Sequence, residues 1–419
     1  MTGKEKVRAA LNHREGPVPV DFGGTTVTGI HCSVVEELRN YYGLEKRPVK
    51  VYDPYQMLGY IDEDLRQALG CDVAQMTSEY DIFGMYYRGN PTLWKTPWGQ
   101  EVLMADNFVC REENGRVFFF PQGDDSAGPS CMIPQGGYFA DAIPRQTEEI
   151  DDDDLNPEDN LEEFRKLTEE DLAFIRENVK NYQDLPYAIQ GGPGGTAIGD
   201  VAFVPGVNLK NPKGVRDVTE WYISVASREE YIQEVFEKQT DIAVYNLQKY
   251  HEAVGDTVDV IQLCGNDFGT QISTFCSPEK FRELYKPYYR KMTDWIHSNT
   301  NWKVFKHSCG AIEPLIGELY EAGFDIINPV QWTAKGMDPQ KLKDKYGKYV
   351  TFWGGGVNTQ KTLPFGRPEE VRDEVLQHLD IFSKGGGYVF NTIHNLQAQV
   401  PVENVIAMVE AVHKFNEGR

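Results

Sequence analysis

The amino-acid sequence predicts an α/β fold, a (β/α)8 TIM barrel with an inserted β-rich segment. Eight short segments rich in apolar, β-branched or aromatic residues recur along the 419 residues, and each ends at a polar or glycine-rich stop. Helical patterns lie between the later segments. Apolar strands that alternate with helices are typical of a parallel sheet, and eight such units are the number that builds a barrel.

The expected strands are apolar at consecutive positions, as strands covered on both faces must be. They lie at 18–22, 72–76, 187–192, 258–264, 303–308, 324–330, 349–354 and 387–393. Helices are expected at 277–299, 310–323, 367–386 and 400–415. The first of these opens with Ser277 as N-cap and Pro278 at the first helical position, a pattern that favours a helix start.

Residues 86–146 interrupt this alternation, because they are rich in aromatic residues, glycine and proline. Within them, 94–102 and 116–123 are typical of β-hairpins. We interpret the segment as an inserted subdomain or lid of one domain that spans residues 1–419. The acidic run 147–164 is expected to be a solvated linker and the start of a helix.

Composition excludes several classes of protein. Lysine and arginine total 42 against 64 acidic residues, so the net charge is −22, which disfavours binding to nucleic acid or anionic membranes. No apolar run approaches the roughly 18 residues that span a bilayer. The charged first residues lack the apolar core of a secretion signal. Seven scattered cysteines indicate reduced thiols, and we expect a cytoplasmic protein.

The strongest candidate site follows the fifth expected strand, because active sites of such barrels lie where the strands end. His307 and Cys309 are two residues apart, so in an extended chain both side chains point the same way. Imidazole and thiolate are ligands that zinc prefers. The third ligand would be His394, after the last strand, or Cys264, at the end of the fourth. The alternative interpretation is a buried core histidine beside a buried cysteine.

Two carboxylates, Asp267 and Glu79, follow other expected strands. Either is a candidate catalytic acid or substrate anchor, and either is equally a candidate cap for the helix that follows. Asn266, Gln331 and Asn391 are further polar residues at strand ends.

Several motifs together resemble the uroporphyrinogen decarboxylase superfamily, and more narrowly its corrinoid-linked methyltransferase branch. That branch includes methylcobalamin:coenzyme M methyltransferases and O-demethylase components. The resemblance runs from about Lys4 to the C-terminus, is weakest over 86–146, and implies a (β/α)8 barrel. Its carriers are GPVPVDFGGT (16–25), GNDFGTQ (265–271), KHSCGAIEPLIGELYEAGFDIINPVQ (306–331), FWGGGVNTQ (352–360) and VPVEN (400–404).

Two departures from the family patterns separate the branches. Porphyrinogen decarboxylases carry an arginine-rich segment after the first strand that holds substrate carboxylates, but here no Arg or Lys lies between Arg14 and Arg39. The HxCG motif at 307–310 resembles the zinc motif of the methyltransferase branch. Where that branch usually has a cysteine as third ligand, this sequence has His394.

The resemblance therefore implies an enzyme with zinc on His307, Cys309 and His394. It would move a methyl group between a small O-methyl (methoxylated) substrate and a corrinoid, free or on a separate corrinoid protein. Asp267 and Glu79 would deliver protons or anchor substrate, with hydrogen bonds from Asn266, Gln331 and Asn391. The alternatives are a methylcorrinoid:thiol methyltransferase, a metal-free lyase of the decarboxylase type, and an accessory binding subunit. A homodimer is possible.

Overall fold

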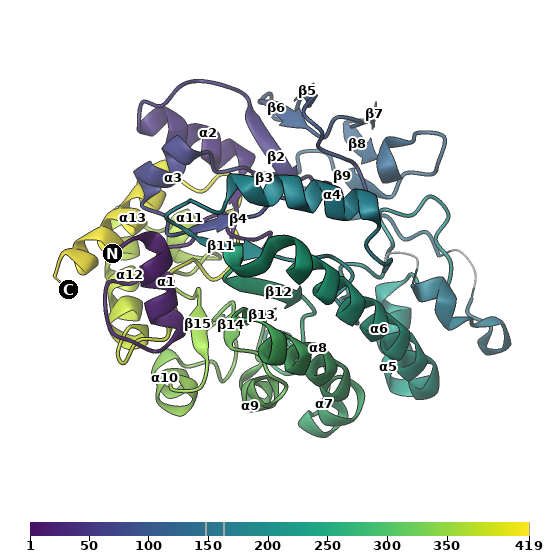
Figure 1. Cartoon of the computed structure of the whole chain (residues 1–419). Coiled ribbons are helices and arrows are strands. Elements are labelled where there is room, and N and C mark those ends of the chain that lie inside the picture. Colours follow the sequence, from purple (N-terminus) through teal and green to yellow (C-terminus); the bar gives the residue numbers. More distant parts are fainter. Residues whose placement is uncertain (147–148, 162–163, 419) are drawn as a thin grey trace.

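The computed structural model describes residues 1–146, 149–161 and 164–418, and at Cys264 the backbone alone. A parallel sheet of seven strands forms its centre, in the spatial order β16-β15-β14-β13-β12-β11-β4 (Figure 1). Each strand lies within one of the predicted segments. The strands are β4 (Val73–Gln75), β11 (Ala188–Gly191), β12 (Val260–Cys264), β13 (Lys303–His307), β14 (Ile326–Asn328), β15 (Thr351–Trp353) and β16 (Tyr388–Val389).

The first predicted strand, 18–22, is not a regular strand but a short bridging segment. Val20 forms a single parallel bridge with Phe390, just beyond β16. On its other side, the Val20 carbonyl accepts a hydrogen bond from the Asp72 amide, just before β4, at 2.7 Å. The segment thus lies between the two edge strands of the sheet.

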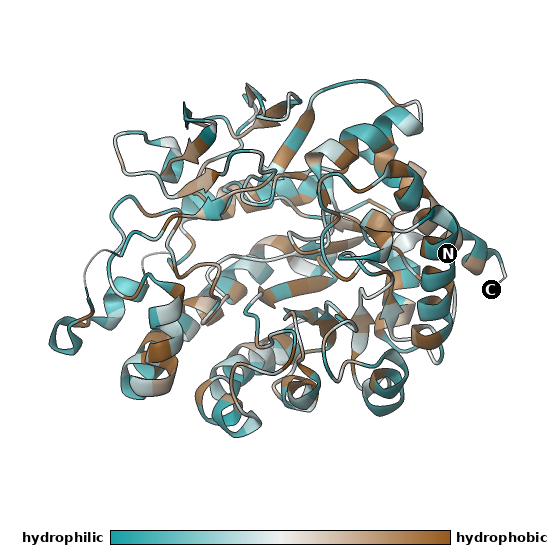
Figure 2. Ribbon diagram, turned by 180° about the vertical axis from the view of Figure 1, so that it is seen from behind, coloured by the Kyte–Doolittle hydropathy of each residue, from teal (hydrophilic) through white to brown (hydrophobic). Residues whose placement is uncertain are grey.

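Helices follow the strands and surround the sheet (Figure 1). In Figure 2, hydrophobic residues lie along the central strands and on one side of these helices, and hydrophilic residues lie on the other side. The helices are α1 (Gly3–Leu11), α2 (Cys32–Tyr41), α3 (Glu63–Leu69), α4 (Glu169–Asn178), α5 (Val218–Ser227), α6 (Glu229–Val254), α7 (Pro278–Leu284), α8 (Lys286–Asn299), α9 (Glu313–Glu321), α10 (Pro339–Tyr346), α11 (Thr362–Phe365), α12 (Pro368–Phe382) and α13 (Val402–Glu417).

The inner face of the sheet changes from apolar to polar along the strands. One residue of each strand packs with Val7, Ala10 and Leu11 of α1 in one fully apolar cluster; these are Val73, Ala188, Val260, Phe305, Ile326, Trp353 and Val389. Because side chains alternate between faces, the residue two positions later lies on the same face. Five strands extend that far, and in each of them that residue is polar: Gln75, Gln190, Gln262, His307 and Asn328. We call these five the polar layer.

The helix predicted at 277–299 is two helices, α7 and α8, and the prediction of one continuous helix is wrong. The break falls at Tyr285, and Pro287 occupies the first turn of α8. Proline has no amide hydrogen to donate and its ring clashes with the carbonyl four residues earlier, so a helix is interrupted there. The other three predicted helices correspond to α9, α12 and α13.

The segment 86–146 is β-rich; a hairpin forms around the predicted range 94–102, whereas the range 116–123 supplies only the second strand of a hairpin over 110–119, and 121–123 is a 3-10 turn. β5 (Thr92–Lys95) pairs with β6 (Glu101–Met104), and β7 (Cys110–Glu113) with β8 (Arg116–Phe119). β6 also pairs with β2 from outside the segment, and β8 with β9. The remaining strands are β1 (Ile30–His31), β2 (Val49–Asp53), β3 (Leu58–Gly59), β9 (Cys131–Ile133) and β10 (Asp141–Ala142).

The acidic run does not contain the predicted helix start. Its residues 152–154 and 157–160 form short 3-10 turns, and 147–148 and 162–163 lie outside the described residues. The next helix, α4, begins only after Thr168, whose hydroxyl accepts a hydrogen bond from the amide of Asp171. Consecutive aspartates are weak helix formers, whereas a threonine cap starts a helix efficiently.

Among the helices described, none combines the length and apolar composition that crossing a membrane requires.

Candidate functional site

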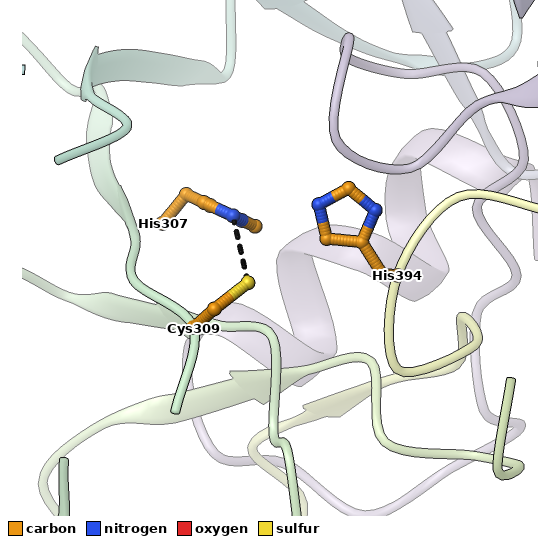
Figure 3. Close-up of side chains that lie close together, drawn as sticks. All are labelled: His307, Cys309 and His394. Atoms are coloured by element: carbon orange, nitrogen blue, oxygen red, sulfur yellow. Dashed lines mark hydrogen bonds between the residues drawn. The ribbon is translucent and has the colours of Figure 1, made fainter. Parts of the chain in front are cut away.

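His307, Cys309 and His394 converge, although the third comes from a loop 85 positions after the second. His307 is the last residue of β13, Cys309 follows it, and His394 lies in the loop after β16. The three candidate ligand atoms all lie within 4.8 Å of one another. The His307 Nε2 to Cys309 Sγ distance is 3.4 Å, and the two imidazole centroids are 5.3 Å apart (Figure 3).

The orientation of His307 is fixed by Asn328 on the neighbouring strand β14. The Asn328 Oδ1 lies 2.6 Å from His307 Nδ1, and the Asn328 Nδ2 donates to the carbonyl of Trp353 at 2.8 Å. Because the Asn328 side-chain nitrogen donates to the Trp353 carbonyl, the Asn328 side-chain oxygen faces the imidazole. The His307 Nδ1 must therefore carry the hydrogen that this oxygen accepts. The lone pair of His307 is therefore on Nε2, which faces Cys309.

Burial sets the protonation of all three side chains. It lowers the pKa of His307 to about 4, with a smaller effect of Lys306 in the same direction. Burial, then the neighbouring His307, lowers the pKa of His394 to about 4. Burial raises the pKa of the Cys309 thiol well above its usual value, and the nearby Asp267 raises it further. At neutral pH the imidazoles are ready to bind a metal, whereas the thiol must first lose its proton.

Two loops hold Cys309 in place. The Cys309 amide donates to Asp267 Oδ1 at 2.6 Å, and the next amide, that of Gly310, donates to Gln331 Oε1 at 2.7 Å. Gly310 has a φ of +92°, and a Cβ there would lie 2.4 Å from the carbonyl carbon of Gly269. Only glycine fits this position, because the loops after β12 and β13 touch backbone to backbone there.

The three side chains fit a zinc ion better than a cation that prefers oxygen ligands. Two imidazole nitrogens and one sulfur form a soft donor set. Zn–N and Zn–S bonds in a tetrahedron place the ligand atoms about 3.3–3.7 Å apart, close to the Nε2–Sγ separation of 3.4 Å. Three protein ligands leave a fourth position open, as in catalytic zinc sites.

The site lies in a cavity of about 840 Å³, which is within the range of small-molecule sites. His307, His394 and Asp267 line it, together with the three glutamines of the polar layer. No lysine or arginine is among the described residues that line it. A second cavity of about 430 Å³ adjoins it and shares ten lining residues with it, Gln75 among them; Lys50 and Arg165 also line this second cavity.

Of the carboxylates proposed as catalytic, one lies beside the triad and one does not. Asp267 lines the larger cavity, with Oδ1 3.8 Å from His307 Nε2. Glu79 lies in the adjoining cavity, where it pairs with Arg88 at 2.6 Å.

The proposed substrate-binding amides lie in the walls around the site rather than among the cavity-lining residues. The Asn266 carbonyl accepts a hydrogen bond from Lys306. Gln331 holds the Gly310 amide, and Asn391 donates to the carbonyl of Asp21 at 2.5 Å. Their role in substrate binding stays a prediction, and the side chain of Cys264 lies outside the described part of the chain.

Sequence reasoning missed three residues that shape this site: Asn328, Gln190 and Lys306. The Lys306 ammonium is fully buried, donates to the carbonyls of Asn266 and His307, and lies 5.2 Å from the Phe268 ring centre. A charged residue inside an apolar strand was the available signal. For Gln190 the signal was a repeated pattern, since β4, β11 and β12 read VAQ, AIQ and VIQ up to the glutamine.

Comparison with known proteins agrees with this architecture. The sequence pattern described as "Uroporphyrinogen decarboxylase (URO-D)" matches residues 210–415. Uroporphyrinogen decarboxylase from Methylococcus capsulatus is 33% identical over 98 residues, which is 23% of this chain and 26% of that protein. The enzyme from Pseudoalteromonas atlantica is 28% identical over 145 residues, which is 33% of this chain and 38% of that protein. The alignments thus span well under half the length of these relatives.

A solved structure extends the likeness to the whole chain. A methyltransferase from Methanosarcina mazei superposes with a TM-score of 0.55 over 99% of both chains, at 17% sequence identity. At that identity the likeness concerns the fold. Together, the family pattern over residues 210–415, the decarboxylase relatives and the shared fold support the resemblance of this chain to the uroporphyrinogen decarboxylase superfamily.

Proposed function

We propose that this protein is a zinc-dependent methyltransferase that moves a methyl group between a small methoxylated compound and a corrinoid. The observation that carries the proposal is the convergence of His307, Cys309 and His394 within 4.8 Å. Two of these side chains line a cavity large enough for a small molecule. The fold shared with a protein named as a methyltransferase supports the same class.

In this proposal the three side chains would hold zinc at the edge of the cavity that His307 and His394 line. When bound, zinc supplies a Lewis acid that stabilises negative charge on an ether oxygen, and the corrinoid exchanges the methyl group. Asn328 keeps the His307 lone pair on Nε2. Asp267 positions Cys309 through its amide and stands beside the cavity, where it would exchange a proton with the substrate oxygen.

The corrinoid would come from a separate corrinoid protein or bind free. Transfer to a thiol would use the same three ligands, because zinc also stabilises a thiolate.

A metal-free decarboxylase is the second candidate, since the curated relatives carry that name. A substrate with several carboxylates needs cationic partners. The described residues that line the larger cavity include no lysine or arginine, which argues against such a substrate there, whereas Lys50 and Arg165 line the adjoining cavity.

The test is metal content together with methyl transfer. The purified protein and the variants H307A, C309A and H394A would be analysed for zinc, with H297A and C110A as matched controls. His297 lies on α8 and Cys110 on β7, outside both cavities. Methyl transfer from 2-methoxyphenol to a Co(I) corrinoid would be followed by the absorbance change of the corrinoid.

We expect about one zinc per chain in the wild type and both controls, and its loss, with activity, in the three site variants. Zinc that persists in all three site variants would refute the metal centre. A stoichiometric metal without transfer from any methoxylated compound or to any thiol would refute the methyltransferase.

A further inference from the structure

Lys50 is a cation of the adjoining cavity with no partner of opposite charge among the described residues. It lies on β2 between Val49 and Val51, which are buried on the other face of the strand. Lys50 shares its face with Tyr52, two positions later, and both residues line the cavity. The Lys50 side chain is therefore on the cavity side of β2 rather than in the core.

Two aromatic rings hold the Lys50 ammonium. Its Nζ lies 5.1 Å from the ring centre of Tyr87, which also lines the cavity, and 5.7 Å from that of Tyr60. It makes no hydrogen bond or ion pair with a described residue. The Nζ is also not among the unpaired polar atoms of the described chain that are closed to solvent, so a ligand can reach it.

The surroundings of this ammonium do not balance its charge. Burial lowers the pKa of Lys50. Asp106 and Asp62 oppose that effect only in part, because neither carboxylate lies within ion-pair distance of the Nζ. A negatively charged ligand would supply the missing counter-charge.

The other charged side chains of this cavity already have partners. The Arg165 guanidinium donates to both carboxylate oxygens of Asp171, at 2.5 and 2.7 Å. Glu79 pairs with Arg88 at 2.6 Å. These pairs leave no free charge to compete for Lys50 or for its ligand.

The two remaining carboxyl groups of the lining, Asp53 and Asp81, are held by the backbone. Each accepts hydrogen bonds from two amides. Burial raises the pKa of both, that of Asp81 to about 7, which reduces the negative charge that would oppose an anionic ligand. Lys50 is thus the charged group of the described lining that still lacks a counter-charge.

The adjoining cavity is continuous with the cavity at the candidate metal centre, because the two share ten lining residues. A compound bound beside His307 and His394 can therefore extend toward Lys50. A single ammonium balances a single negative charge, which favours a carboxylate over a phosphate. Hydrogen bonds between such ionised groups are roughly twice as strong as those between neutral ones.

We propose that Lys50 is a substrate-binding residue, and that the substrate is a methoxylated compound with one anionic group, such as a carboxylate. The anionic group lies in the adjoining cavity, and the methoxy group lies at the candidate metal centre. This inference rests on the proposed function and deepens it, because it names the substrate class of the same site.

The test is binding without turnover, by calorimetry on the protein supplied with zinc and without corrinoid. The probes are 4-methoxybenzoate and 4-methoxybenzamide, which have the same shape and differ in charge. K50M removes the ammonium, and K50R keeps a positive charge. K348M is the matched control, because the Lys348 ammonium also lies over a ring, that of Tyr349 at 4.8 Å, outside both cavities. Each variant is also melted without ligand.

The wild type should bind 4-methoxybenzoate at least about tenfold more tightly than 4-methoxybenzamide. K50M should weaken 4-methoxybenzoate about 10- to 100-fold and change 4-methoxybenzamide less than about threefold. K50R should stay within about tenfold of the wild type, because it retains the charge with a different geometry. K348M should bind as the wild type does. A purely structural Lys50 would lower the melting temperature of K50M and weaken both probes alike.

Equal affinity of the wild type for the two probes would overturn the inference. So would unchanged 4-methoxybenzoate affinity in K50M, equal weakening of both probes, or the absence of binding of both. Failure of the proposed methyltransferase looks different, because charge-selective binding and its dependence on Lys50 would persist while no methyl group reached the corrinoid. Conversely, methyl transfer with the same 4-methoxybenzoate affinity in wild type and K50M would keep the proposed function and refute the role of Lys50.

Discussion

Asn328 is expected to control zinc affinity without touching the metal. It is fully buried, and its carboxamide connects the His307 Nδ1 to the carbonyl of Trp353. In N328A, the imidazole loses the partner that keeps its hydrogen on Nδ1. Removing such a partner of a metal-binding histidine typically weakens metal affinity 10- to 100-fold, or about 1.4–2.8 kcal/mol.

The same change should lower stability by a separate route. N328A leaves the Nδ1–H group and the Trp353 carbonyl buried without partners, and each such group costs about 1–3 kcal/mol. We therefore expect the metal-free variant to lose roughly 2–5 kcal/mol of unfolding free energy. N328D keeps an acceptor for Nδ1 but has no donor for Trp353, so it should bind zinc within about threefold of wild type while still being less stable.

Zinc affinity would be measured by competition with a chromophoric chelator, and stability by urea unfolding of the metal-free protein. N404A is the matched control. Asn404 of α13 is equally buried and donates to the carbonyls of Leu363 and Gly366, away from the triad. It should lose stability and keep zinc affinity. Wild-type affinity in N328A, or equal weakening in N328A and N328D, would refute the role given to Asn328.

Three further predictions follow from the same geometry. Zinc binding at pH 7 should release about one proton, from Cys309, because both imidazoles are already neutral; calorimetry in buffers of different ionisation enthalpy counts it, and zero release would contradict the protonated thiol. D267N should keep zinc and lower the transfer rate at least about tenfold; an unchanged rate would remove Asp267 from the chemistry. Burial raises the pKa of Asp21 to about 6, above the usual 3.9 of the unfolded chain, so folding disfavours its charged form at pH 7 and this penalty is relieved as the pH falls. The wild type should therefore gain roughly 2 kcal/mol relative to D21N between pH 7 and pH 4.5 in urea unfolding, and a pH-independent difference would refute the shift.

The sequence predicts the sheet well because its strands are covered on both faces. Such strands are apolar at consecutive positions, and seven of the eight expected segments contain a strand of the sheet. The segment 18–22 is equally apolar, but only Val20 within it forms a bridge to the sheet. The break at Tyr285 was not predicted, because the hydrophobic periodicity over 277–299 continues past Pro287. A continuous helix cannot accommodate a proline in its interior, so the helix is interrupted there.

The metal triad was predictable in part for a geometric reason. His307 and Cys309 are close in sequence, and the carboxyl ends of parallel strands meet at one edge, which brought His394 into consideration. Asn328 and Lys306 were not predicted, because their roles depend on which atoms face each other across neighbouring strands. Only the observed pairing of His307 with Asn328 on β14 puts that carboxamide beside the imidazole.

The sequence alone does not place the glutamines of the polar layer on the inner face of the sheet. A glutamine at the end of an apolar strand is compatible with the inner face, the outer face or a turn, so AIQ alone does not assign Gln190 to the site. The assignment follows once Ala188 is seen to pack with α1, because the residue two positions later must then share the inner face. The register places Gln190 opposite Gln75 of β4.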